Sequence, residues 1–267
     1  MALNLSRKLA LAVGIISVGM VVLYLSLPIV ALFLRTSPLL FYTSVQEQQV
    51  IDALVLSFVT AGIALLVIII VGTPAAYFHS RNNYHGKWVV DILIDLPLVL
   101  PPAVAGLALL LFYGRMGLFG KYLHIFGIDI AFTAVAVILA QIFVASPFYI
   151  RNAKSLFGQL DPAYEQTALT LGASPLWVFA TIALPLVAKG LVSGIVMTFA
   201  RALGEFGATI MVAGNLPGIT QTMPLAIYGA MEGDFNVAIT ISILLVLISF
   251  GIMAVISIIT RRKGLLD

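Results

Sequence analysis

The chain has 267 residues, of which 61% are hydrophobic and only 9% are charged, whereas soluble proteins average about 45–50% and about 25%. A mean hydropathy of +1.13 leaves too few polar side chains to cover a surface in water, which excludes an ordinary soluble domain. The formal charge of +3, from 14 basic and 11 acidic residues, therefore reflects membrane topology rather than binding to nucleic acid. Because the sequence contains no cysteine, disulfides, cysteine metal sites and thiol catalysis are excluded as well.

Six stretches are long and apolar enough to cross a lipid bilayer as helices, since about 20 residues span about 30 Å of hydrocarbon. Four of them carry no charge: 9–34, 53–78, 130–150 and 235–260. The stretch 88–113 carries two aspartates and three prolines, which predict a distorted first half. The stretch 190–213 is interrupted only by Arg201 and Glu205. We therefore expect an all-α integral membrane protein with six transmembrane helices.

The stretch 166–188 is also uncharged and long enough to cross, but its helix start and stop signals argue against a span. Asp161-Pro162 and Ser174-Pro175 each have the pattern of an N-cap followed by a first-turn proline. Gly172 lies between them as a helix stop, and Pro185 predicts the end of the second helix. We therefore predict two short helices joined by a tight corner over 161–185, each too short to cross lipid.

The positions of the basic residues agree with this number of spans. With the N-terminus in the cytoplasm, ten of them fall on the inner side: Arg7, Lys8, Arg81, Lys87, Arg151, Lys154, Lys189, Arg261, Arg262 and Lys263. Only Arg35, Arg115 and Lys121 fall outside, and Arg201 lies within a span. Cytoplasmic loops carry the excess of Lys and Arg, so both termini are predicted to be cytoplasmic, and a seventh span would put 261–263 on the wrong side. The first apolar run exceeds a signal-peptide core and lacks a small-residue cleavage site, so we expect a retained anchor.

The residue types that are missing narrow the function. The three histidines, His79, His85 and His124, all lie near the ends of the expected spans or outside them, which disfavours a metal-dependent membrane enzyme. The phosphate-binding Gly-x-x-x-x-Gly-Lys-Ser/Thr pattern does not occur, so the chain does not hydrolyse ATP through a P-loop. We expect no enzymatic activity and no cofactor. Energy for transport would come from an ion gradient or from a partner protein.

The cytoplasmic segment 161–185 is unusually apolar for a segment on the aqueous side of the membrane. Its large apolar residues are Tyr164, Leu169, Leu171, Leu176, Trp177, Val178, Phe179, Ile182 and Leu184. Such a surface does not face water without a reason. One interpretation is an amphipathic helix lying in the lipid interface. The interpretation that we favour is a docking site for a cytoplasmic protein.

This segment carries a specific motif. Residues 165–172 read Glu-Gln-Thr-Ala-Leu-Thr-Leu-Gly, and Ile-Ala-Leu-Pro follows at 182–185. The pattern resembles the Glu-Ala-Ala…Gly…Ile-x-Leu-Pro loop of ABC importer permeases, except that Gln166 begins the motif and the acid stands one place earlier, at Glu165. The resemblance implies that this loop fits a groove on an ATP-binding subunit. It assigns the contact to Glu165, Gln166, Ala168, Leu171, Gly172, Ala173 and Trp177, with Gly172 at the corner.

A second set of segments narrows the resemblance. Residues 199–209 contain Gly-Glu-Phe-Gly at 204–207, followed by Ala-Gly-Asn-Leu-Pro-Gly at 213–218, and 97–106 contain Pro-Leu-Val-Leu-Pro-Pro. Together they are similar to the oxyanion-importing branch, most of all to molybdate/tungstate permeases, and sulfate permeases share the Gly-Glu-Phe-Gly core. The resemblance implies a type I importer architecture, a homodimer in the cell membrane, two ATP-binding cassette subunits and an extracytoplasmic oxyanion-binding protein. It divides the chain into an N-terminal helix with its outer loop (1–52), a permease domain (53–260) and a cytoplasmic tail (261–267).

Arg201 and Glu205 are four residues apart on one helical face and are the charged pair within a span. They are either a mutually neutralising structural pair or part of an anion route in which Glu205 keeps Arg201 from binding too tightly. We expect the translocation pathway and gate to involve Arg201, Glu205, Pro101, Pro102 and Gly207. The outer segment 214–235 is expected to form part of the outer gate and of the docking surface for the extracytoplasmic binding protein. The alternatives are a sulfate-type permease and a gradient-driven secondary transporter, which needs titratable groups at mid-membrane, where Glu205 is the candidate.

Overall fold

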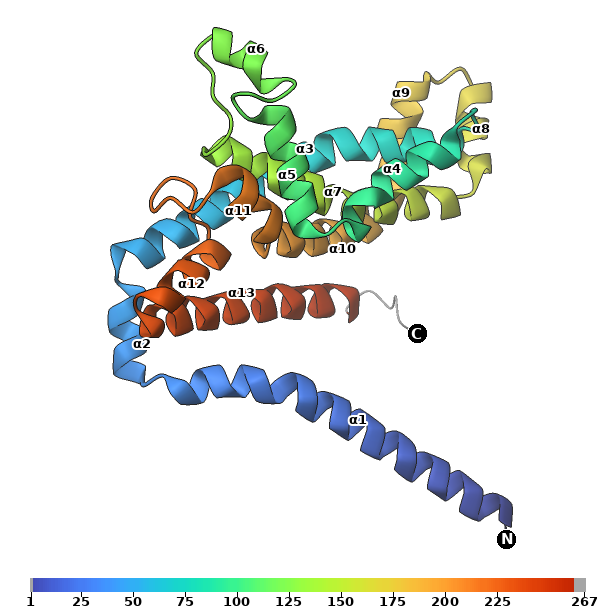
Figure 1. Cartoon of the computed structure of the whole chain (residues 1–267). Coiled ribbons are helices and arrows are strands. Elements are labelled where there is room, and N and C mark those ends of the chain that lie inside the picture. Colours follow the sequence, from blue (N-terminus) through green and yellow to red (C-terminus); the bar gives the residue numbers. More distant parts are fainter. Residues whose placement is uncertain (1, 262–267) are drawn as a thin grey trace.

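The computed structural model describes the backbone of residues 2–261 and the side chains of residues 11–254. Within this part every regular element is a helix (Figure 1). Long helices cover the four uncharged stretches: α1 (Ala2–Arg35), α3 (Gln48–Arg81), α7 (Ala134–Gln159) and α13 (Phe235–Arg261). Both α3 and α7 continue past their apolar stretch at the C-terminal end, because the polar residues there extend the helix beyond lipid. The four predicted spans are confirmed.

The third span is broken, as its prolines predict. It consists of α4 (Lys87–Val99) and α5 (Pro102–Tyr113), whose axes differ in direction by 114°. The chain is extended at Leu100 and Pro101, and Pro102 occupies the first turn of α5. Two consecutive residues without an N–H cannot continue the hydrogen bonds of α4, so the helix ends before them. With this bent pair counted as one span, the described chain has six candidate spans.

The fifth span differs from the prediction at both ends. Helix α9 (Pro175–Val178), a π-helical turn η1 (Phe179–Ala183) and α10 (Leu184–Leu203) form one apolar helical run of 29 residues. The prediction that a separate short helix ends near Pro185 is therefore wrong. The N–H of Leu184 bonds the carbonyl of Phe179, five residues back, and this wider turn accommodates the proline without ending the helix.

The same span ends earlier than the predicted 213. Helix α10 stops at Leu203, the chain breaks at 204–206, and a short helix α11 (Gly207–Ala213) continues. The other half of the 161–185 prediction is confirmed, because α8 (Pro162–Thr170) is a nine-residue helix that begins at an Asp161 N-cap.

The long helices pack in three apolar clusters. The first joins α3, α7 and α10 and includes Tyr149, Phe157 and Leu203. The second joins α5, α7 and α11, and the third joins α3 and α13 with α12 (Met223–Glu232). Helix α7 therefore runs through two clusters. In Figure 1, α8 and α9 lie at one end of the bundle, and α12 lies at the other end with α2 (Pro38–Val45).

Helix α1 is hardly packed against the rest of the chain. None of its apolar span is buried, and in Figure 1 it diverges from α13 toward its N-terminus. Both the start of α1 and the end of α13 lie toward the α8 end of the molecule (Figure 1). The side chains of Arg7, Lys8 and 261–263 lie outside the described residues, so the cytoplasmic placement of the termini stays a prediction, as does the division at 52 and 260.

The outer segment 214–235 is more ordered than its turn-forming residues suggest. After a loop it forms α12. A separate short helix, α6 (Gly120–Ile125), lies in the loop that follows α5. The backbone N–H of Met223 donates to Ser57 Oγ of α3 at 2.7 Å, and Gln49 Nε2 donates to Gln221 Oε1 at 3.1 Å. Thr220, Gln221 and Met223 are buried. This segment is thus fixed to the end of α3 opposite α8.

Candidate functional site

The corner between α8 and α9 is built around Gly172. Its φ of +89° lies in the left-handed region that glycine adopts without a steric cost. The N–H of Gly172 bonds the Leu169 carbonyl at 3.0 Å, and that of Ala173 bonds the Ala168 carbonyl at 3.1 Å. These two bonds form a Schellman motif, which ends a helix by satisfying its last carbonyls. The Ser174 hydroxyl then accepts the N–H of Trp177 at 3.3 Å and starts α9.

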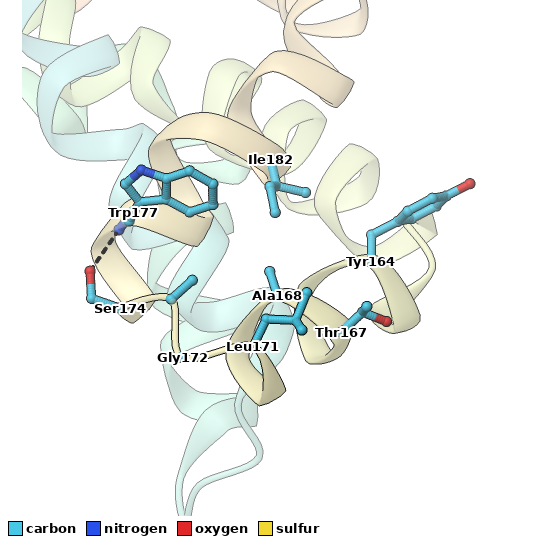
Figure 2. Close-up of a pocket in the computed structure, with 9 residues that line it drawn as sticks. Tyr164, Thr167, Ala168, Leu171, Gly172, Ser174, Trp177 and Ile182 are labelled. Carbon is cyan, nitrogen blue, oxygen red and sulfur yellow. Dashed lines mark hydrogen bonds between the residues drawn. The ribbon is translucent and has the colours of Figure 1, made fainter.

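The corner encloses an apolar hollow. Its volume is about 690 Å³. In Figure 2 the Trp177 indole lies on one side of the hollow, Leu171 and Ala168 lie on the opposite side, and Ile182 closes its inner end. The lining residues are Tyr164, Thr167, Ala168, Leu171, Gly172, Ala173, Ser174, Trp177 and Ile182. Leu171 is 83% exposed and Trp177 is 52% exposed, so the hollow presents large apolar groups to an outside partner.

Glu165 does not belong to this hollow. Its side chain is buried, and Arg81 at the end of α3 donates to Oε1 from Nε at 3.0 Å and from Nη2 at 2.6 Å. Tyr77 Oη donates to Oε2 at 2.8 Å, and Arg81 also donates to the Leu160 carbonyl at 3.1 Å. These two N–H groups of Arg81 form a charged fork on one carboxylate oxygen, which fixes both the orientation and the position of the Glu165 side chain. Glu165 therefore attaches α8 to α3 rather than pointing outward.

Five of the seven predicted contact residues line the hollow: Ala168, Leu171, Gly172, Ala173 and Trp177. Gln166 is exposed but lies outside the lining, and Glu165 faces inward. The reason is the helical period of α8: the lining residues Tyr164, Thr167, Ala168 and Leu171 are three or four residues apart and share one face, and Glu165 lies to the side of that face, toward α3. Arg81 and Tyr77, which hold Glu165, were not predicted as site residues; the basic residue at the end of an apolar span was the available signal.

The Arg201–Glu205 pair lies where the fifth span breaks. Arg201 Nη2 donates to Glu205 Oε2 at 2.6 Å, and the other oxygen, Oε1, accepts the backbone N–H of Ala208 at 2.8 Å. Glu205 is 1% exposed, whereas the Arg201 side chain is 31% exposed. The carboxylate thus caps the start of α11 and neutralises the arginine at once. Only Arg201 is left with surface that a ligand can reach.

The two broken spans cross at glycines. A Cβ on Gly207 would lie 2.3 Å from the Pro102 Cβ, and a Cβ on Gly106 would lie 2.6 Å from the Ala208 carbonyl oxygen. Only glycine permits this approach of α5 and α11. The break after Leu203 therefore lies against the break before Pro102, and α5 and α11 pack as one unit.

A cavity of about 170 Å³ lies beside this crossing. It is lined by Pro97, Leu98, Leu100, Pro102, Ala105, Val144, Phe148 and Arg201. The predicted pathway residues Arg201 and Pro102 thus meet at one cavity. Pro101 is exposed at the break, and Glu205 and Gly207 support the cavity from behind.

Residues 68–264 match the protein family described as "Binding-protein-dependent transport system inner membrane component". The chain belongs to this family. Its members are the membrane permease subunits of ABC importers, in which ATP is hydrolysed by separate subunits. The permease is therefore a multi-pass protein of the cell membrane and a transport subunit, not an ATPase.

Two relatives and one solved structure show which known transport proteins the permease resembles. It is 40% identical over 230 residues to the "Molybdenum transport system permease protein ModB" of Mycobacterium tuberculosis, covering 85% of this chain and 86% of that protein. It is 33% identical over 249 residues to the "Probable sulfate transport system permease protein cysT" of Zygnema circumcarinatum, covering 91% and 86%. A chain of a bacterial ABC transporter involved in the import of the acidic polysaccharide alginate superposes with a TM-score of 0.75 over 98% of both chains, at 17% identity. That likeness confirms the type I importer fold.

Proposed function

We propose that the permease forms the membrane-spanning part of an ATP-driven importer for molybdate or tungstate. The 40% identity to a molybdenum permease over most of both chains supports the substrate class. The structural observation that carries the proposal is the apolar hollow at the α8–α9 corner, because it gives the chain a docking surface for an ATPase that it does not itself contain.

The docking surface implies two ATP-binding cassette subunits. Closure of the ATPase pair would move α8, and the Glu165–Arg81 fork would pass this movement to α3. One permease chain supplies one hollow, so a second copy is needed to engage both ATPase chains. The unpacked α1 leaves apolar surface for lipid and for that copy. An extracytoplasmic oxyanion-binding protein would dock at the opposite end, near α12, and deliver the ion.

The chemistry of the pathway follows from Arg201. A single guanidinium at a cavity in a low-dielectric bundle attracts a dianion, and the bonded Glu205 carboxylate weakens that attraction so that the ion can leave. The permease contributes electrostatics and gating and forms no covalent bond to its cargo.

A sulfate importer is the second candidate, and the 33% identity to a sulfate permease supports it. A gradient-driven transporter is supported less well. Within the described residues Glu205 is the buried acid at the break between α10 and α11, and its oxygens are engaged by Arg201 and Ala208 rather than left available for a proton cycle.

The test is uptake into proteoliposomes that contain the permease, the ATPase subunits and the loaded binding protein. We expect accumulation of radiolabelled molybdate that requires ATP and is competed by tungstate better than by sulfate. Uptake driven by an ion gradient in liposomes with the permease alone would overturn the proposal. Preferential competition by sulfate would replace molybdate with the second candidate.

A variant tests the docking surface in the same assay. Val at Gly172 must adopt φ of +89° at a cost of about 1–2 kcal/mol, so the corner is populated about tenfold less. We expect Gly172→Val to lose ATP-driven uptake. The matched control is Gly158→Val in α7, where an added Cβ meets nothing within 4 Å and φ is not positive. Equal uptake by the two variants would contradict the assignment of the corner.

A further inference from the structure

A second cavity lies between α4 and α7, outside the site described above. Its volume is about 340 Å³. It is lined by Asp91, Ile94, Asp95, Ile150, Arg151, Lys154 and Ser155. Four of these seven residues are charged, in a chain with only 9% charged residues. Asp91 and Asp95 lie in an expected span, where charges are costly, and Arg151 and Lys154 directly follow the apolar stretch of α7, so the four charges gather at the edge of the lipid-spanning region.

This charged cavity continues the cavity at Arg201. The Arg201 cavity is lined by 97–100 of α4 and by Val144 and Phe148 of α7, and the charged cavity by 91–95 and by 150–155. The two helices run antiparallel, so the cavities follow one another along one groove. Phe148 and Arg151 are about 5 Å apart along the axis of α7, at 1.5 Å per residue. The charged cavity lies nearer the α8 end.

Each basic side chain in this groove is paired with the carboxylate of an aspartate. Lys154 Nζ contacts Asp91, which also bonds His79 Nε2 at 2.8 Å, and Arg151 Nε lies 3.5 Å from Asp95. The Arg151 side chain is 61% exposed, so its pairing is loose. The pattern repeats that of Arg201 with Glu205. A carboxylate beside each base occupies the place of an anion and can be exchanged for one.

The groove is also easily widened. Helix α4 has no buried residue; it packs mainly against α7 and is bonded to α3 through the Asp91–His79 contact. The Ser155 hydroxyl accepts a hydrogen bond from Gln159 Nε2 at 3.0 Å and retains its own hydrogen for donation. Arg151, Lys154 and Ser155 therefore offer two positive charges and a hydroxyl donor on one face of α7, one turn apart.

We propose that Arg151, Lys154 and Ser155 form a low-affinity station for the tetrahedral oxyanion, through which the ion leaves the Arg201 cavity by displacing Asp95 and Asp91. The station rests on the proposed function, because it takes the same dianion. The displaced Asp95 and Asp91 carboxylates stay in the groove and compete with the ion for Arg151 and Lys154, so no single site holds the ion tightly. The competing interpretation of the same contacts is a latch that only ties α4 to α7.

Because the chain contains no cysteine, Ser155→Cys introduces a single thiol into the groove. The experiment measures its reaction rate in the full-length permease in lipid nanodiscs with a negatively charged methanethiosulfonate (ethylsulfonate) and a positively charged one (ethyltrimethylammonium). The control is Thr181→Cys, an exposed position of η1 outside the groove. We expect the ratio of anionic to cationic rate to be about fivefold higher at 155 than at 181. Tungstate should slow labelling at 155, and chloride at equal ionic strength should not.

Charge variants separate the station from a latch. With Ser155→Cys, the pair Arg151→Gln and Lys154→Gln should abolish both the anion preference and the tungstate protection, whereas Asp91→Asn and Asp95→Asn should strengthen both. A latch predicts that removing either side of the ion pairs has the same effect. Equal rates with the two reagents, no protection by tungstate, or the same response to both sets of variants would overturn the station.

The outcome is independent of the uptake assay. ATP-driven molybdate uptake by a permease whose Ser155→Cys thiol shows no anion preference would refute the station alone. Anion preference and tungstate protection in a permease that shows no ATP-driven uptake would refute the proposed function and leave the groove an anion site.

Discussion

At the scale of residues, the most informative side chain is Glu165. Its place in the motif suggested an outward contact, but the structure turns it toward Arg81 and Tyr77. Whether a residue of a nine-residue helix faces its own bundle or a partner depends on which face the bundle covers. The sequence shows the helical period of α8 but not which of its faces the bundle covers. Gly172, in contrast, was predictable, because the left-handed corner is a local property of the chain.

The Glu165–Arg81 fork leads to a prediction about stability. Both side chains are at most 15% exposed, so removing one partner leaves the other buried without its charge pair. We expect Glu165→Gln and Arg81→Gln each to cost about 3–5 kcal/mol and to lower the Tm of the purified permease in detergent. The double variant should be no less stable than either single variant, because it leaves no unpaired charge. Additive losses would show that the two side chains act independently.

At the scale of elements, the structure shows that two spans are broken at the same place. The prolines predicted the break in the third span, but no proline marks the break at 204–206. There the Glu205 carboxylate caps α11, and the glycines at 106 and 207 let α5 and α11 cross closely. Hydropathy alone predicts one continuous helix over 190–213. The continuation of α9 through Pro185 was missed for a similar reason, because a π-turn leaves no simple pattern in hydropathy.

The glycine crossing leads to a prediction about one methyl group. In Gly207→Ala the new Cβ would lie 2.3 Å from the Pro102 Cβ, so α11 must move away from α5. We expect a loss of about 1–3 kcal/mol in stability and a marked fall in oxyanion uptake. Gly204→Ala is the matched control, since its Cβ would lie 3.5 Å from the nearest atom, the Ala200 carbonyl oxygen. Thermal unfolding and uptake of the two variants check this, and a wild-type Tm for Gly207→Ala would refute the close crossing.

At the scale of the whole molecule, two apolar surfaces of the described residues stand out as uncovered. One is the α8–α9 hollow, and the other is helix α1. A membrane covers the apolar surface at the depth of the spans, but the hollow lies at one end of the bundle (Figure 1). This difference in position is why we assign the hollow to a protein and α1 to lipid and a second copy.

This assignment leads to a prediction about stoichiometry. We expect the purified transporter to contain two permease chains and two ATPase chains, because each permease chain presents one hollow. Native mass spectrometry of the complex in detergent measures the ratio directly. Gly172→Val should release ATPase chains while the permease pair persists, since we expect the pair to form away from the hollow. A complex with a single permease chain would contradict the homodimer.

The sequence by itself determined that the protein lies in lipid, how many times it crosses and where the α8–α9 corner turns. These properties depend on local composition, helix caps and glycine φ, all of which act over a few neighbouring residues. Only the tertiary structure decided that Glu165 faces inward, that the breaks of two spans meet at Gly207 and Pro102, and that Asp91, Asp95, Arg151 and Lys154 share one cavity. Those outcomes depend on which helices become neighbours. Helices of similar hydrophobicity choose neighbours by shape and by a few buried polar contacts, and neither can be read from residue order.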